Sequence, residues 1–245
     1  MTLVKICGNR TAEDVLAAAE AGADFVGMIF ADSSRRVTVD EGQAMVRALG
    51  EPLSAREMPV PPPSLPHVRE EVDDWFRHGA VVLQGHLEIK RPLTVGVFAD
   101  QPIDELNEIV EAAGVDLVQL SGDESWEDCL LVTRQVIQVV HVSPIDSPSV
   151  PMQFVEPGFA IALMLDAAHG RHRGGTGRTF DWEVARMVAE RLPLMLAGGL
   201  TPQNVGEAIE RVQPWAVDVS SGTERDGRKD YELVRAFIDA VHRAA

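Results

Sequence analysis

One thiol and one carboxylate stand out in this sequence because each ends a short apolar run. Cys7 closes the run that begins at Leu3, and Asp166 follows residues 161–165. A thiol and a carboxylate facing one cavity can act as general base and general acid on a small substrate. Lys5 shares the strand face of Cys7, and a nearby ammonium favours the thiolate. The alternatives are a small buried side chain at Cys7 and a turn cap at Asp166.

Residues 192–222 predict a strand, a turn, a helix and a second strand. The apolar runs 194–197 and 216–219 are each closed by small residues, as is typical of buried parallel strands. Thr201 and Pro202 predict where the intervening helix starts. Glycine-rich turns after neighbouring strands present bare amides that bind phosphate, although tight turns alone would also use glycine. The predicted phosphate-binding residues are Gly198, Gly199, Ser221 and Gly222.

The elements that must position these groups alternate along nearly the whole chain. Strands are predicted at 3–7, 25–30, 94–98, 117–120, 138–142, 160–165, 194–197 and 216–219, and helices at 11–21, 39–49, 103–113, 127–134, 182–190, 201–212 and 231–243. Alternating strands and helices imply a parallel sheet, and eight units favour closure. We therefore expect one α/β domain over residues 1–245, a single (β/α)8 barrel, with a doubly wound sheet as the alternative.

The composition limits the partners. The chain has 245 residues, 45% hydrophobic, and a net charge of −16, which disfavours nucleic acid and anionic membranes as partners. Its two cysteines form no disulfide framework, and no Cys/His spacing suggests zinc. No secretion signal or membrane-spanning run is present, so the cytoplasm is the expected compartment.

Local positive charge interrupts this acidic background at two places. Arg171, Arg173 and Arg178 lie in the loop after Asp166, where they can attract an anionic substrate. Residues 172–179 lack the first glycine and the lysine of a nucleotide-binding P-loop, and two nearby histidines without further ligands do not make a metal site. Arg35 and Arg36 form either a solvated pair or a fork for a carboxylate.

The motifs together resemble the phosphoribosylanthranilate isomerase family of tryptophan biosynthesis. The matching segments are VKICGNRTAEDVLAAAEAGADFVGMIF (4–30), VTVDEGQA (37–44), VGVFAD (95–100), VDLVQLSGDE (115–124), LDAAHGRHRGGTGRTFDW (165–182), LAGGLTPQNVGEAI (196–209) and VDVSSGTERDGRKD (217–230). They cover most of the chain outside residues 50–92. The resemblance implies a cofactor-free Amadori rearrangement of N-(5-phosphoribosyl)anthranilate to 1-(2-carboxyphenylamino)-1-deoxyribulose 5-phosphate, acting as a monomer or homodimer on a small phosphorylated molecule.

The resemblance also implies roles for individual residues. Asp166 would be the acid that protonates the furanose ring oxygen, and Cys7 the base that removes the C2 proton. Arg36 would contact the anthranilate carboxylate, and Asp218 would line the site from the last strand. The remaining substrate-binding positions by this resemblance are Lys5, Ser121 and Arg178, and the phosphate loops are those named above.

The chain departs from the family pattern at three places. Ser121 stands where the family usually has histidine, and Arg178 where it has lysine. Residues 50–92 are predicted to be a proline-rich insertion between the second helix and the third strand. It should emerge at the barrel end opposite the site, as a surface excursion with helical spacing near Trp75 and a short strand at 80–83. Its functional alternative is a docking or dimer surface on Trp75 and Phe76.

Two other functions stay open at this point. A paralogue that isomerises a different phosphosugar would fit the exchange at Ser121. A non-catalytic docking or phosphate-ligand protein would fit the insertion and the glycine loops, but it would have no need for both Cys7 and Asp166.

Overall fold

Eight strands form a closed parallel barrel in chain order, as predicted, so the doubly wound alternative is wrong. The structure is a computed structural model and describes residues 1–53, 72–142, 150–153, 155–167 and 182–244. The barrel strands are β1 Leu3–Ile6, β2 Phe25–Ile29, β3 Leu93–Phe98, β4 Leu117–Leu120, β5 Val136–Val142, β6 Ala162–Ala167, β7 Leu194–Leu196 and β8 Ala216–Val219.

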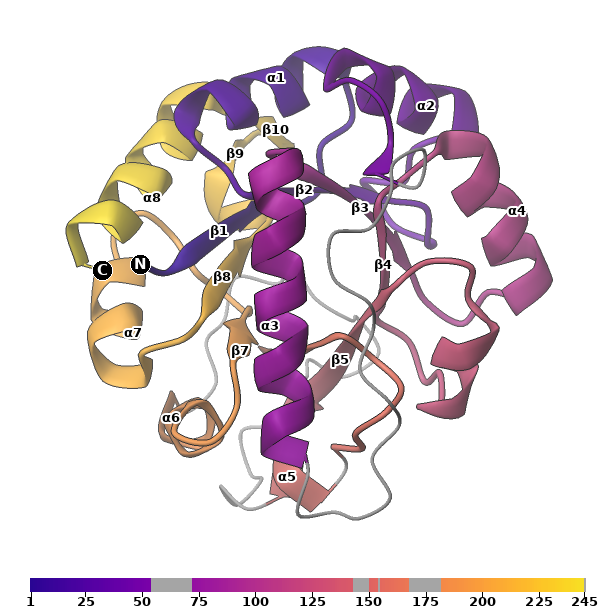
Figure 1. Cartoon of the computed structure of the whole chain (residues 1–245). Helices are drawn as coiled ribbons and strands as arrows, with labels where there is room; N and C mark the ends of the chain where they lie inside the picture. Colours follow the sequence, from indigo (N-terminus) through magenta and orange to yellow (C-terminus); the bar gives the residue numbers. More distant parts are fainter. Residues whose placement is uncertain (54–71, 143–149, 154, 168–181, 245) are drawn as a thin grey trace.

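The helices surround this barrel in a ring, except for α3 (Val72–Ile89), which lies across the barrel in the view of Figure 1. The α-helices are α1 Ala12–Ala21, α2 Val39–Ala48, α3 Val72–Ile89, α4 Ile103–Ala113, α5 Val150–Gln153, α6 Trp182–Ala189, α7 Val205–Val212 and α8 Tyr231–Ala244. Two 3-10 helices, η3 Glu127–Leu131 and η4 Ser221–Thr223, and a small hairpin, β9 Glu224–Arg225 with β10 Arg228–Lys229, complete the described elements.

Local chemistry sets most of these boundaries. Thr11 begins α1 with a capping box, in which its side chain accepts from the Asp14 amide and the Asp14 carboxylate accepts from the Thr11 amide. Gly22 and Gly114 end α1 and α4 in the left-handed conformation, with φ of 101° and 76°. A residue with a Cβ would be strained there, so both helix-to-strand corners depend on glycine.

Three predicted boundaries need correction. The helix between β7 and β8 starts at Val205 rather than at Pro202, because residues 202–204 form a turn. The helix predicted at 127–134 is the short η3. Strand β6 extends to Ala167, so Asp166 lies within the strand and not directly after it. The strand ladder with β5, which pairs His141 with Asp166, holds these last residues extended.

Strand alternation divides the apolar side chains into two layers. One layer lies between the strands and the surrounding helices and includes Val4, Ile6, Val26 and Met28. The other layer fills the N-terminal half of the barrel interior. Most of its side chains come from the first inward-facing residue of each strand. Its barrel members include Leu3, Phe25, Leu93, Leu117, Ile137, Ala162 and Ala216.

Helix α3 closes this N-terminal end of the barrel. Its side chains Val82, Leu83 and Leu87 belong to the interior layer and are 0%, 0% and 4% exposed. The helix lies against the barrel end at Gly79, where a Cβ would overlap the backbone oxygen of Ile161. Residues 72–89 therefore lie opposite the strand ends that carry the candidate site, as predicted, and the strand predicted at 80–83 is wrong because these residues are helical.

The two aromatic residues that suggested a docking surface are part of this packing. Phe76 is 1% exposed and its ring meets Trp126 edge-on at 6.4 Å between centroids. The Trp75 indole donates to the Ala160 carbonyl at 2.7 Å. Phe76 is not accessible to a partner, so the docking surface predicted on these two side chains is wrong. The flexible excursion predicted at 54–67 lies outside the described residues.

Candidate functional site

Lys5 and Cys7 occupy the inward face of β1 because strand side chains alternate, and β8 faces them with Asp218. Lys5 and Asp218 are register partners in the β1–β8 ladder, and the Lys5 Nζ donates to Asp218 Oδ1 at 2.7 Å. The Lys5 side chain is 0% exposed. Burial by itself lowers the pKa of Lys5, but the charges of Asp218 and Cys7 together raise it above its ordinary value. Lys5 is therefore held as a paired ammonium inside the barrel.

Cys7 lies next to this pair at the C-terminal end of β1. A Cβ added to Gly27 would lie 2.7 Å from the Cys7 Sγ and 3.1 Å from the Lys5 Nζ, so the missing side chain of Gly27 gives both groups their room. Burial raises the pKa of the Cys7 thiol; Lys5 lowers it, while Asp218 opposes Lys5. The expectation that Lys5 favours the thiolate was right about the direction of its effect and wrong about the net result. The ammonium is already neutralised by Asp218, so burial decides.

Asp166 faces the same interior from β6. Its Oδ1 accepts from the Ala167 amide at 2.8 Å. The same oxygen would lie 3.1 Å from a Cβ on Gly198, so the carboxylate borders the glycine turn after β7. Asp166 is half-buried.

The two predicted phosphate loops meet between these strands. Gly198 and Gly199 have φ of 92° and 67°, which turns the chain sharply after β7. A Cβ on Gly222 would overlap the carbonyl oxygen of Leu200, so only glycine lets the loop after β8 approach the loop after β7. Ser221 and Gly222 lie in η4, a short extra helix after the last strand. Such a helix beside the β7 and β8 loops is the usual phosphate site of this fold.

A buried ion network supports the β8 loop, and sequence reasoning missed most of it. Arg35 donates to both carboxylate oxygens of Glu224, at 2.7 and 2.8 Å. Lys229, whose side chain is 1% exposed, donates to the Ser220 carbonyl at 2.8 Å and lies 3.4 Å from Glu224. Burial lowers the pKa of Lys229 and opposes the attraction of Glu224. Two signals were present in the sequence. Arg35 belongs to the pair predicted as solvated or as a fork for a carboxylate, and its guanidinium does fork a carboxylate, that of Glu224. The cluster of charges after Gly222 was interpreted as part of a motif and not as a support.

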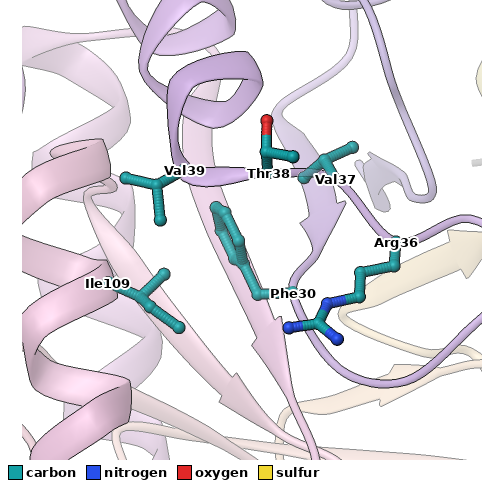
Figure 2. Close-up of a pocket in the computed structure, with 6 residues that line it drawn as sticks. All are labelled: Phe30, Arg36, Val37, Thr38, Val39 and Ile109. Atoms are coloured by element: carbon teal, nitrogen blue, oxygen red, sulfur yellow. The ribbon is translucent and has the colours of Figure 1, made fainter.

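Arg36 lies apart from these groups, at a pocket of about 250 Å³ between α2 and α4. Figure 2 shows its side chain beside Phe30, which comes from the end of β2. Arg36 is exposed, and Phe30 stacks on Phe98 on the outer side of the barrel, with centroids 5.3 Å apart. The structure thus places Arg36 at the rim, whereas Cys7 lies inside. The other pocket-lining residues are Val37, Thr38, Val39 and Ile109.

Ser121 follows β4 and is enclosed by two neighbours. Its hydroxyl accepts from the Gln119 amide at 2.9 Å, and the His141 Nε2 lies 2.9 Å from its carbonyl oxygen. Sequence reasoning passed over His141, although the alternation of Ile137 and Val139 in β5 would have placed it on the inward face. An imidazole therefore lies at this side of the barrel mouth, on a different strand from the family's usual histidine.

The predicted contact of Arg178 lies outside the described residues, as do Arg171, Arg173 and the two histidines of that loop. Within the described ranges, no group of three or more His, Cys, Asp or Glu side chains could hold a metal ion. None of the described helices has the length and hydropathy of a membrane span.

Comparison with known proteins identifies the family. The family model for N-(5'-phosphoribosyl)anthranilate (PRA) isomerase matches residues 71–240. The chain belongs to the PRA isomerase family. The N-(5'-phosphoribosyl)anthranilate isomerase of Dehalococcoides mccartyi is 35% identical over 246 residues, which cover 98% of this chain and 96% of that protein. This membership confirms the resemblance from which the site residues were assigned.

Two further proteins are similar to this chain over nearly its whole length. A multifunctional tryptophan biosynthesis protein of Phycomyces blakesleeanus is 38% identical over 252 residues, covering 96% of this chain and 32% of that protein, so this chain spans about a third of it. A solved PRA isomerase in complex with reduced 1-(o-carboxyphenylamino)-1-deoxyribulose 5-phosphate has a TM-score of 0.68 and 27% identity, over 99% of this chain and 100% of that one. The two chains thus share the barrel fold.

Proposed function

We propose that this PRA isomerase converts N-(5-phosphoribosyl)anthranilate to 1-(2-carboxyphenylamino)-1-deoxyribulose 5-phosphate in tryptophan biosynthesis. One observation carries the assignment of the site. In the closed barrel, the order β6, β7, β8, β1 places both glycine loops between the strand of Asp166 and the strand of Cys7. A substrate whose phosphate binds these loops would therefore have its sugar between an acid and a base.

The rearrangement needs only proton transfers. Asp166 protonates the furanose ring oxygen, the C1–O bond breaks, and the anthranilate nitrogen forms a Schiff base with C1. Cys7 then removes the proton from C2, and the electron pair moves through C1 to the nitrogen, giving an enolamine that tautomerises to the ketone. No oxidant or cofactor enters this balance. An acid and a base in place each contribute about 10²–10⁴-fold.

The surroundings of Cys7 fit the role of a base inside a dry cavity. A thiol whose pKa is raised by burial forms a stronger base once it is deprotonated. The neighbouring Lys5 ammonium attracts the negative charge of that thiolate. Asp218 keeps Lys5 charged and oriented. Arg36 at the rim would contact the anthranilate carboxylate, with Ser121 and Arg178 as further substrate contacts. Gly198, Gly199, Ser221 and Gly222 hold the phosphate by their backbone amides.

Several broader properties follow as part of the proposal. The partner is a small phosphorylated molecule, and the protein acts in the cytoplasm as a monomer or homodimer. Residues 50–92 form an insertion within one barrel domain, of which α3 closes the end opposite the site.

The deciding experiment follows the loss of anthranilate-type fluorescence when purified protein meets freshly made phosphoribosylanthranilate, with Asp166→Asn alongside. Turnover by the wild type that disappears in Asp166→Asn supports the proposal. Wild-type protein that binds the reduced product analogue without turnover would instead favour the second candidate, an isomerase of another phosphosugar, which Ser121 motivates. Full turnover by Asp166→Asn would contradict the role of the acid.

A further inference from the structure

His141 places an imidazole in the barrel mouth next to the proposed acid. Ile137, Val139 and His141 share the inward face of β5, and the first two belong to the interior layer of the barrel. His141 is the register partner of Asp166 in the β5–β6 ladder. Register partners on neighbouring strands have their side chains on the same face, roughly 5 Å apart. Any molecule that reaches Asp166 from the mouth therefore comes within reach of this ring.

The ring is held in one orientation. The His141 Nε2 lies 2.9 Å from the Ser121 carbonyl oxygen, and a carbonyl oxygen only accepts, so Nε2 carries a hydrogen and donates. In the neutral ring the other nitrogen, Nδ1, then presents a lone pair. Nδ1 is buried and has no hydrogen-bond partner within the described ranges. Buried polar atoms of this kind are rare and need an explanation, because leaving them unsatisfied is costly.

We infer that His141 is a substrate-contacting residue, whose Nδ1 accepts a hydrogen bond from a hydroxyl or amine hydrogen at the sugar end of the phosphorylated substrate. This inference rests on the proposed function and adds a specificity-determining group to it. An acceptor held beside Asp166 favours a substrate that carries a donor there and disfavours an analogue lacking it, because the buried acceptor would then stay unpaired.

Ser121 contributes to this arrangement through its backbone. Its small side chain turns toward Gln119, which donates to the hydroxyl at 2.9 Å, and its carbonyl oxygen receives the His141 ring. The imidazole thus enters the mouth from β5 and is anchored on the end of β4. The exchange at Ser121 is in this view compensated by a residue of the neighbouring strand and does not by itself require a different substrate.

Two substitutions separate a substrate contact from a purely structural role. In His141→Gln the amide can still donate to the Ser121 carbonyl but presents no acceptor at the place of Nδ1. In His141→Asn the side-chain oxygen can take the place of Nδ1, but the asparagine side chain is too short to reach the Ser121 carbonyl. We expect His141→Gln to keep the melting temperature within about 2 °C and to lose roughly tenfold in kcat/KM, mainly through KM. We expect His141→Asn to melt lower and to keep more activity than His141→Gln.

His86→Gln is the matched control, because it makes the same exchange at a buried histidine of α3, at the opposite end of the barrel, and should leave kcat/KM unchanged. Wild-type kcat/KM in His141→Gln would overturn the inference, as would losses in both variants that merely follow the fraction of folded protein. If the wild type itself does not turn over phosphoribosylanthranilate, the proposed function fails. The inference is then decided by calorimetry with the reduced product analogue, which His141→Gln must bind about tenfold more weakly than the wild type.

Discussion

The two ends of this barrel differ in what their side chains do. At the C-terminal end the inward positions carry Lys5, Cys7, Asp166 and Asp218, with glycine turns beside them. At the N-terminal end the inward positions are apolar and α3 lies across them, with Leu83 at 0% exposure. The same strands thus supply reactive groups at one end and packing at the other.

The C-terminal end of the barrel depends on the closed N-terminal end. Helix α3 covers the N-terminal end of the barrel, so water cannot enter from that end. The Lys5 side chain, at 0% exposure, is surrounded by protein and not by solvent. In this water-excluded interior, burial raises the pKa of Cys7. The Lys5 ammonium is kept charged there by its hydrogen bond to the Asp218 carboxylate. Changes at the C-terminal end should therefore alter turnover, and changes at the N-terminal end should alter stability.

The largest expected effect tests the reactive end. Cys7→Ala removes the proposed base and should lower kcat by about 10²–10⁴-fold, while the melting temperature changes little. Steady-state fluorescence kinetics with thermal unfolding measures both. Cys129→Ala is the control, since Cys129 is also buried but lies in η3, and burial raises its pKa to about 12. Near-normal turnover in Cys7→Ala would disprove the assignment of the base.

The next effect tests the closed end. Leu83→Ala opens a cavity between α3 and the barrel, which should cost about 2–5 kcal/mol of unfolding free energy without changing kcat of the folded protein. Urea unfolding gives the free energy. The control is Val81→Ala on the same helix, which is 56% exposed and should change stability by less than about 0.5 kcal/mol. A stable Leu83→Ala protein would mean that α3 is not needed to close the barrel.

Two glycines allow the same perturbation at both ends. A Cβ would overlap a backbone oxygen at Gly79, which meets Ile161, and at Gly222, which meets Leu200. We expect Gly79→Ala to lose about 1–3 kcal/mol of stability at unchanged KM. Gly222→Ala should raise KM for the phosphorylated substrate by roughly tenfold, because the β8 loop must move away from the β7 loop. Equal effects of the two variants on KM would remove the distinction between the ends.

The smallest effect is a pH dependence at the closed end. His86 on α3 is 0% exposed, and burial lowers its pKa below the ordinary 6.5 despite the opposing charge of Asp116. The unfolded chain therefore takes up a proton near pH 6.5 that the folded chain does not, and stability falls as the pH drops below 6.5. The slope from this one group is at most about 1.4 kcal/mol per pH unit.

His86→Gln does not titrate and should have a flatter dependence of unfolding free energy on pH between 6.5 and 5. Chemical denaturation of wild type and variant at several pH values measures the difference. Parallel curves would mean that His86 becomes charged in the folded protein without cost.

The local part of this structure could be read from the sequence. Thr11 with Asp14 and the glycine corner at Gly22 set the ends of α1 by contacts within four residues. Alternation within β1 placed Lys5 and Cys7 on one face, and the glycines after β7 and β8 indicated turns with free amides. These features depend on chain geometry over a few residues, so the order of residues alone specifies them.

Other features required the closed barrel. The Lys5–Asp218 pair joins residues 213 positions apart, and the Arg35–Glu224 pair joins residues 189 apart. His141 has an inward direction from alternation, but its contact with Ser121 depends on the stagger between β4 and β5. Apolar spacing predicted a helix near Trp75 but not that its apolar face covers the barrel end.

Local sequence patterns were sufficient to predict eight alternating strand and helix units, the positions of Cys7 and Asp166 near strand ends, and the two glycine loops. Closure of the sheet, the pairing of the buried charges, the effect of burial against Lys5 at the Cys7 thiol and the position of α3 became known from the three-dimensional structure. Those outcomes depend on the distance between groups brought together by closure of β8 onto β1 and on the water that closure removes.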